Sequence, residues 1–177
     1  MADDPNARSP FPGSPDAAAP GPLGDLQDAD TAGTSILVVD DNLQNLELLH
    51  AYLEELGLPV RTARDGLEAL QAVEVQQPDI ILLDVMMPRM SGFQACAKIK
   101  SNPETRDIPV VMVTALNEVG DVERAVESGA DDFLTKPVNK LELLTRVKSL
   151  LRVRLLKRQL DRALAQMQNF RRESPGA

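Results

Sequence analysis

The stretch Ile36–Asn42, with the sequence ILVVDDN, runs four apolar residues directly into two adjacent aspartates. A short, continuous apolar run is typical of a strand that helices cover on both faces, as in a parallel sheet. Asp40 and Asp41 would then lie at the mouth of this strand, where mutual repulsion and loss of water both disfavour two negative charges. The stretch therefore predicts a buried strand, and it raises the question of what stabilises the paired carboxylates.

Short apolar runs and amphipathic segments alternate along the chain after this first strand. The further apolar runs predict strands at Val60–Ala63, Ile80–Leu83, Val110–Val113 and Phe133–Leu134. The intervening segments carry apolar residues at helical spacing, which predicts helices at Leu43–Leu56, Gly66–Gln76, Gly92–Lys100 and Val119–Ser128. Strands that alternate with helices imply βαβ crossovers, so we expect a doubly wound α/β fold with a five-stranded parallel sheet and helices on both faces.

The composition fits one compact domain with appended segments. The chain has 177 residues, of which 43% are apolar and 26% are charged, enough for one sizeable core. Trp is absent and Tyr occurs once, so the core must be aliphatic. The single cysteine, Cys96, excludes an internal disulfide and is compatible with a reducing compartment. With no export signal and no apolar run long enough to cross a bilayer, we expect a cytoplasmic protein.

The two ends of the chain differ in composition from its middle. Residues 1–34 are rich in Pro, Ala, Gly and Asp and have almost no apolar residues at strand or helix spacing. Such a segment cannot bury enough apolar surface to offset its ordering entropy, so we expect a disordered arm, with a hidden binding motif as the alternative. The folded domain should cover residues 35–152, followed by a helical extension over 153–172 and a disordered tail over 173–177.

The last expected helix is longer than a sheet requires. After Pro137 neither Gly nor Pro occurs until Pro175, which allows a helix of about 33 residues. Such a helix spans about 50 Å, whereas the domain should have a radius of gyration of about 13 Å, so part of the helix must project. The projecting part has the 4-3-4-3 spacing of a coiled coil, which makes a homodimer one candidate assembly and a fraying, solvated tail the other. The spaced residues are Leu156, Leu160, Ala163, Met167 and Phe170.

Charge is unevenly distributed along the chain. The net charge is −8, but residues Lys140–Arg172 hold ten Lys or Arg against two carboxylates, which leaves −16 for the rest. The acidic part is a poor candidate for binding nucleic acid or anionic lipid. The basic helix lacks aromatic stacking partners, and a charged helical face is usually only solvated, so we expect no nucleic-acid binding there. Its basic residues are Arg152, Arg154, Lys157, Arg158 and Arg162.

Five polar side chains follow the expected strands at their carboxyl ends. Asp40 and Asp41 follow the first strand, Asp84 follows the third and Thr114 the fourth, and Lys136 comes after the fifth. Because ligands of open parallel sheets bind at the carboxyl ends of the strands, we expect these side chains to meet at one edge. A lone aspartate such as Asp40 is more often a helix cap or turn residue, so the evidence lies in the whole set.

The set has a definite chemistry. Three clustered carboxylates should raise the pKa of at least one member, and a hard cation such as Mg²⁺, which prefers oxygen ligands, would relieve this repulsion. One carboxylate oxygen of Asp84 could then attack a phosphoryl group. Lys136 would supply a positive charge to that group, and the Thr114 hydroxyl a hydrogen bond.

Four motifs, VVDDN, LLDVMMP, MVTA and LTKP, occur in this order, and together they resemble the receiver domain of bacterial two-component response regulators over about Ser35 to Arg152. The resemblance implies a flavodoxin-like sheet with strand order 2-1-3-4-5 and a histidine kinase or phosphotransfer protein as phosphodonor. It implies that Asp84 is the phosphoacceptor and that Asp41 binds Mg²⁺ directly. Asp40 would act through a metal-bound water, and the Met86 backbone carbonyl would complete the protein ligands.

The resemblance also assigns a switch. Thr114 and Lys136 would contact the phosphoryl group, and Lys136-Pro137 would be a cis peptide bond. Phe133 matches the switch aromatic, although it could equally be a core residue of a short strand. Ser91 stands where an aspartate is common, but it can cap the following helix equally well.

The expected output is protein contact, because no DNA-binding, cyclase or phosphodiesterase signature follows the receiver-like region. The downstream protein partner is not identified by the sequence. We expect no enzyme activity beyond assisting its own phosphorylation and dephosphorylation, and the latter should be slow because bulky apolar Met86 and Leu116 flank the path of the hydrolytic water. A phosphohydrolase would need a second carboxylate at position 86, while an adaptor indifferent to phosphate remains the alternative function.

Overall fold

The computed structural model describes residues 33–115, 123–124 and 126–173, with side chains up to residue 169. The expected amino-terminal arm up to residue 32, Leu116, half of the helix expected at Val119–Ser128 and the last four residues lie outside this range. All five expected strands lie within the described residues.

The five expected strands form one sheet, in which every neighbouring pair is parallel and the order is β2-β1-β3-β4-β5. The predicted fold class and strand order are therefore confirmed. Two strands are one residue longer than predicted, so that Asp84 and Thr114 are the last residues of their strands, and the fifth strand is longer by one residue at each end. The strands are β1 (Ile36–Val39), β2 (Val60–Ala63), β3 (Ile80–Asp84), β4 (Val110–Thr114) and β5 (Asp132–Thr135).

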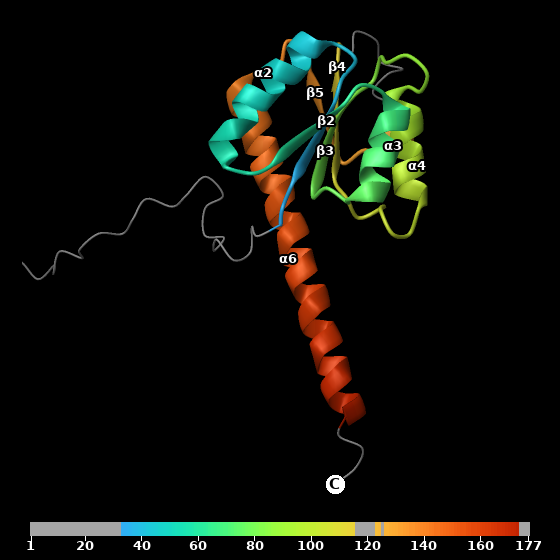
Figure 1. The fold of residues 1–177 in the computed structure, drawn as a ribbon, viewed down its shortest axis with the longest axis vertical. Helices are drawn as coiled ribbons and strands as arrows, with labels where there is room; N and C mark the ends of the chain where they lie inside the picture. Colours follow the sequence, from blue (N-terminus) through green and yellow to red (C-terminus); the bar gives the residue numbers. More distant parts are fainter. Residues whose placement is uncertain (1–32, 116–122, 125, 174–177) are drawn as a thin grey trace, which may run out of the picture.

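The described helices follow the predicted order (Figure 1). The first differs from its prediction at its carboxyl end, where the last turn tightens into a 3₁₀ helix before Gly57, whose φ of 65° ends it in the left-handed region. The helices are α2 (Leu43–Leu53), the 3₁₀ helix η1 (Glu54–Leu56), α3 (Gly66–Val75), α4 (Gly92–Ser101) and α6 (Lys140–Glu173).

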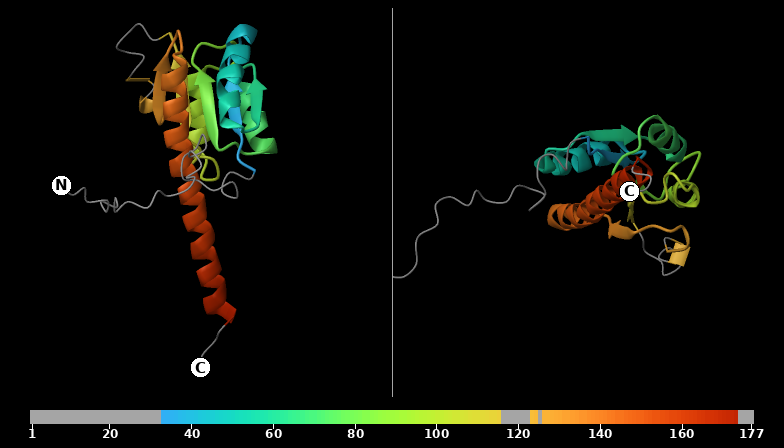
Figure 2. Two further views of the ribbon diagram at one scale, coloured as in Figure 1. Left: turned by 90° about the vertical axis from the view of Figure 1, so that its left-hand side faces the viewer. Right: turned by 90° about the horizontal axis from the view of Figure 1, so that it is seen from below.

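Helices cover both faces of the sheet, with α2 and α6 on one side and α3 and α4 on the other (Figures 1 and 2). Successive residues of β1 point to opposite faces, so Ile36 and Val38 join the core cluster under α2 and α6, while Leu37 and Val39 join the cluster under α3 and α4. Both clusters are almost wholly aliphatic, as the composition predicts. Cys96 is buried in the second cluster, where it acts as a packing residue.

Helix α6 has 34 residues and extends far past the domain (Figures 1 and 2). Its buried leucines and valine, from Leu143 to Leu155, recur at a spacing of four residues and pack on the sheet side of the helix. From Leu156 onward the helix has no buried side chain among its described residues. We call Leu156–Glu173 the stalk.

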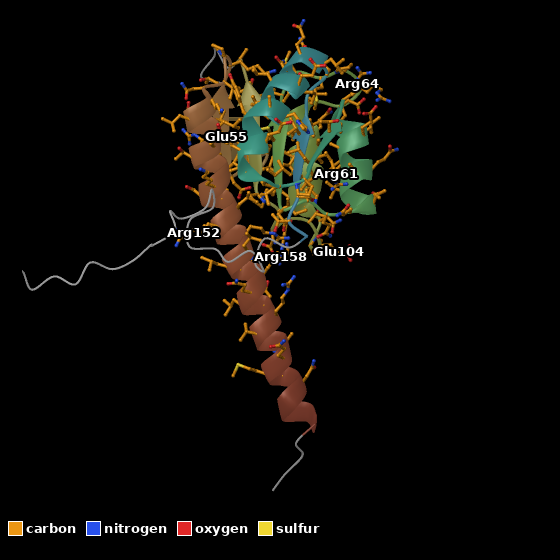
Figure 3. All side chains as sticks on the ribbon, turned by 60° about the vertical axis from the view of Figure 1, so that its left-hand side comes forward. Glu55, Arg61, Arg64, Glu104, Arg152 and Arg158 are labelled. Atoms are coloured by element: carbon orange, nitrogen blue, oxygen red, sulfur yellow. The ribbon has the colours of Figure 1, made fainter. Side chains whose placement is uncertain are left out.

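Two ion pairs hold the base of the stalk against the domain. Lys157 Nζ lies 2.6 Å from Asp107 Oδ1, and the Arg158 guanidinium pairs with Asp79, a buried residue immediately before β3. Figure 3 shows Arg158 at the end of the domain from which the stalk projects. The stalk therefore leaves the domain at the amino-terminal edge of the strands, opposite the edge that carries Asp84. No helix in the described part of the chain is long and apolar enough to cross a membrane.

Candidate acidic site

The structure brings the three predicted carboxylates together. Asp40, Asp41 and Asp84 each offer one oxygen, and these oxygens lie within 4.8 Å of one another. Asp40 and Asp84 are buried, whereas Asp41 is exposed. The cluster is therefore partly buried at the carboxyl edge of the sheet, and its exposed side borders solvent.

Lys136 lies between the two buried carboxylates. Its Nζ is 2.8 Å from Asp40 Oδ2 and 3.0 Å from Asp84 Oδ1. The Lys136 backbone N–H donates to the Thr114 carbonyl at 2.8 Å, which ties the residue after β5 to the end of β4. The Lys136-Pro137 peptide bond is cis, as predicted.

The pKa of Asp84 is raised, as the sequence predicts, but the main cause differs from the one expected. Burial raises this pKa most, the hydrogen bond and charge of Lys136 lower it, and repulsion from Asp40 makes a smaller contribution. Burial also lowers the pKa of Lys136, but its hydrogen bonds to Asp40 and Asp84 outweigh this, so the pKa is raised overall. Lys136 therefore stays protonated and holds the two carboxylates together.

Asp40 is oriented by donors from the protein itself. Its Oδ1 accepts a hydrogen bond from the Asn42 backbone N–H at 2.9 Å, so Asp40 is also the turn residue that a lone aspartate suggests. Asn45 Nδ2, one turn into α2, donates to both oxygens at 3.1 and 3.2 Å. Sequence reasoning missed Asn45. Its position in the first turn after the acidic pair was the available signal, but most side chains at such positions face solvent.

The turn after β3 is packed closely against Asp84. A Cβ added to Gly92 would lie 2.1 Å from the Asp84 carbonyl oxygen, so only glycine fits there. Ser91 caps α4 and forms a capping box with Gln94, which confirms the predicted cap. These contacts fix the path of the chain immediately after the acidic residue.

An ion pair that the sequence did not predict holds the same turn to α3. Arg89, at a φ of 64°, pairs with Asp65 and lies 3.2 Å from Glu68. Asp65 is buried and caps α3 through the Leu67 and Glu68 N–H groups. The turn that carries Met86, whose side chain is 76% exposed, is thereby attached to a neighbouring helix.

Thr114 and Phe133 differ in burial. Thr114 is buried at the end of β4 and pairs in register with Thr135. Phe133 is 39% exposed, so its interpretation as a core residue is wrong. The reason is that β5 is the edge strand, and Leu134 is its only buried residue. The switch interpretation of Phe133 stays a prediction.

A pocket of about 450 Å³ opens beside Lys136, between α2 and the segment that follows β5. Its walls are mostly apolar, and one of them, Leu48, is 45% exposed. The lining residues are Asn45, Leu48, Leu49, Tyr52, Val113, Lys136, Pro137 and Val138.

A doubly wound parallel sheet with an acidic cluster and a lysine at its carboxyl edge is the arrangement expected of an α/β receiver domain. Residues 36–148 match the family model described as the response regulator receiver domain. This is more than half of the chain, so the chain belongs to that family and is a two-component response regulator receiver domain. Receiver domains are in general signalling domains rather than enzymes.

Two curated relatives illustrate the match. The response regulator PleD of Caulobacter vibrioides is 53% identical over 121 residues, which are 68% of this chain and 27% of PleD. The DNA-binding dual master transcriptional regulator RpaA of Synechocystis is 45% identical over 118 residues, which are 66% of this chain and 48% of RpaA. This chain therefore spans less than half the length of either relative.

Solved receiver domains share the fold. One, from a signal transduction histidine kinase of Syntrophus aciditrophicus, is 41% identical with a TM-score of 0.64 over 67% of this chain and 90% of its own. Another, from a sensor histidine kinase of Pseudomonas aeruginosa PAO1, holds a magnesium ion in its active site cleft. It is 33% identical with a TM-score of 0.63 over 67% of this chain and 98% of its own.

Proposed function

We propose that this chain is a phospho-accepting response regulator in which Asp84 takes a phosphoryl group from a phosphohistidine of a histidine kinase or phosphotransfer protein. The observation that carries the proposal is the position of Lys136 Nζ, within 3.0 Å of Asp84 and 2.8 Å of Asp40 in the acidic cluster. A buried carboxylate next to a partly buried cation and an exposed acid is arranged to receive and hold a charged group.

The transfer follows from this arrangement. One carboxylate oxygen of Asp84 attacks phosphorus and forms a P–O bond, while the P–N bond of the donor breaks and its electron pair returns to the imidazole nitrogen. Lys136 and the Thr114 hydroxyl then bind the transferred phosphoryl oxygens. The apolar pocket beside Lys136 supports a protein donor, because it gives a partner surface to pack on next to Asp84.

The residues present fit a Mg²⁺ site. All candidate ligands are oxygens, and their span of 4.8 Å is close to the roughly 4 Å that separates opposite ligands of octahedral Mg²⁺. Asp41, Asp84 and the Met86 carbonyl would hold the ion directly. Both Asp40 oxygens already accept hydrogen bonds from the protein, which favours contact through water. When bound, Mg²⁺ neutralises negative charge on the phosphoryl group during transfer.

The output is a change in protein contacts, with no enzyme activity beyond assisting phosphorylation and dephosphorylation of Asp84. Phosphorylation draws Thr114 and Lys136 toward the phosphoryl group. This movement shifts the conformational equilibrium of the surface formed by α6 and by β5, which carries the exposed Phe133. Lys136 supports this route because α6 begins at Lys140, four residues later. The contacts that change are those with a downstream protein and with a second copy through α6.

Intact mass spectrometry tests the acceptor. Incubation with acetyl phosphate and Mg²⁺ should add the mass of one phosphoryl group to the wild-type chain and none to Asp84→Asn. Addition to Asp84→Asn at the wild-type rate would contradict the assignment. The adaptor alternative predicts that Asp84→Asn binds its partners unchanged, so it is favoured if phosphorylation alters neither self-association nor partner affinity.

A further inference from the structure

From Val153 onward, α6 presents an apolar stripe that no described part of the domain covers. Val153, Leu156, Leu160 and Met167 are each at least 50% exposed, and Ala163 is exposed as well. These five residues follow a 3-4-3-4 spacing, which is the a and d pattern of a heptad, and we call them the stalk seam. The structure thus adds Val153 to the residues that the sequence alone identifies.

The seam lies on the side of α6 opposite the domain. Leu151 and Leu155 are buried against the domain. At 3.6 residues per turn, Leu160 is about half a turn around the helix from Leu151. The domain therefore cannot cover the seam, and two copies could join there with their domains on the outer sides.

The charges of the stalk favour a second copy over an acidic or basic partner. Lys157 and Arg158 are already neutralised by Asp107 and Asp79 of the same chain. Accordingly, the hydrogen bond from Lys157 lowers the pKa of Asp107. From residue 159 to residue 169 the sequence contains one acid, Asp161, and one base, Arg162. An uncharged apolar stripe with heptad spacing is suited to a copy of itself.

We propose that the stalk seam pairs with the same seam of a second copy, as a parallel two-stranded coiled coil. Val153 at an a position and Leu156 at a d position are the combination that favours two parallel strands. The seam positions before Val153 are Ser149, Arg146 and Glu142, so pairing begins where the stalk leaves the domain.

Pairing through the seam does not depend on the proposed function, but its use as an output does. The seam spans little more than two heptads, so it should form a weak dimer that dissociates on dilution. Phosphorylation at Asp84 would then shift this equilibrium through α6, which begins four residues after Lys136.

Sedimentation of the full chain over a range of concentrations tests the pairing. The wild-type mass should rise toward that of a dimer with concentration, whereas Leu160→Glu should stay monomeric because it places a charge in the seam. Ala165→Glu is the matched control, since it adds the same charge on the opposite side of the stalk, and it should behave as wild type. A wild-type monomer throughout, or a Leu160→Glu dimer of unchanged affinity, would overturn the proposal.

Cysteine cross-linking tests the direction. In a parallel pair, Val153→Cys should cross-link to itself and Met167→Cys to itself, while a mixture of the two should give no mixed product. A mixed product without self-linked species would show antiparallel pairing and overturn the parallel arrangement. Arg162→Cys, off the seam, should not cross-link.

The acceptor assay separates this inference from the proposed function. The Leu160→Glu variant should still gain one phosphoryl group from acetyl phosphate, because residue 160 lies far from Asp84. If neither this variant nor the wild-type chain gained a phosphoryl group, that result would count against the proposed function and would leave the dimer result unaffected.

Discussion

Asp84 ends a buried strand, and its burial raises its pKa above the ordinary value of 3.8. The folded chain therefore binds this proton more tightly than the unfolded chain. It follows that ionisation of Asp84 lowers the free energy of unfolding as the pH rises from 3.8 through the raised pKa, and that the loss is complete above it.

Replacement of Asp84 by Asn should therefore stabilise the metal-free protein at neutral pH. The variant removes the desolvated charge, while Lys136 keeps its partner Asp40. Urea unfolding in the presence of a chelator should show a higher midpoint for Asp84→Asn near pH 7, with the difference shrinking as the pH falls toward 3.8. Asp41→Asn, at an exposed residue, is the control and should change stability by less than about 0.5 kcal/mol. A lower midpoint for Asp84→Asn would contradict the prediction.

Met86 bears on how long the phosphoryl group persists. Its side chain is large, apolar and 76% exposed two residues after Asp84, so it can shield the acyl phosphate from water. Radiolabelled phosphoprotein should therefore lose its label slowly, over hours, and Met86→Asn should lose it faster. Complete loss from wild type within a minute would refute this prediction.

At the scale of elements, α6 is attached to the sheet by apolar packing along its first half and by ion pairs at the base of the stalk. The two ion pairs differ in burial. Asp79 has a side chain that is 5% exposed and also accepts the Ser35 N–H at 3.0 Å, whereas Asp107 is 44% exposed. The first pair should therefore contribute more to stability than the second.

Alanine substitutions at the two basic partners test this difference. Arg158→Ala leaves a buried carboxylate without its cation and should lower the free energy of unfolding by about 1–3 kcal/mol. Lys157→Ala removes an exposed pair and should lower it by less than about 1 kcal/mol. Denaturant unfolding of both variants gives the comparison, and equal effects would mean that the burial of Asp79 is unimportant.

The elements also show which features the sequence could predict. The strands and their order follow from continuous apolar runs such as Ile80–Leu83, because a short run of this kind is typical of a strand that is buried on both faces of a parallel sheet. The orientation of Phe133 could not be predicted from the sequence, because an aromatic residue in an edge strand can point toward the core or toward solvent. The 3₁₀ turn at Glu54–Leu56 was missed because apolar spacing does not distinguish a tightened last turn from an α-helical one.

At the scale of the whole molecule, the acidic cluster could be predicted because parallel strands bring their carboxyl ends to one edge. Contacts between distant segments could not be predicted from the sequence. Arg158 reaches Asp79 from 79 residues away, and Arg89 reaches Asp65 from 24, and neither pair leaves a local pattern. The five basic residues between Arg152 and Arg162 looked like a solvated face in the sequence, yet two of them, Lys157 and Arg158, pair with acids of the domain.

The unbroken course of α6 places the end of the stalk well away from the domain. Beyond the ion pair of Arg158 the helix continues for 15 residues, and at about 1.5 Å per residue these extend it by about 22 Å. A rigid rod of this length that pivots by about 10° at its base moves its tip by about 4 Å. A rotation of α6 at this point would therefore be transmitted to the far end of the helix, where it would displace a bound partner.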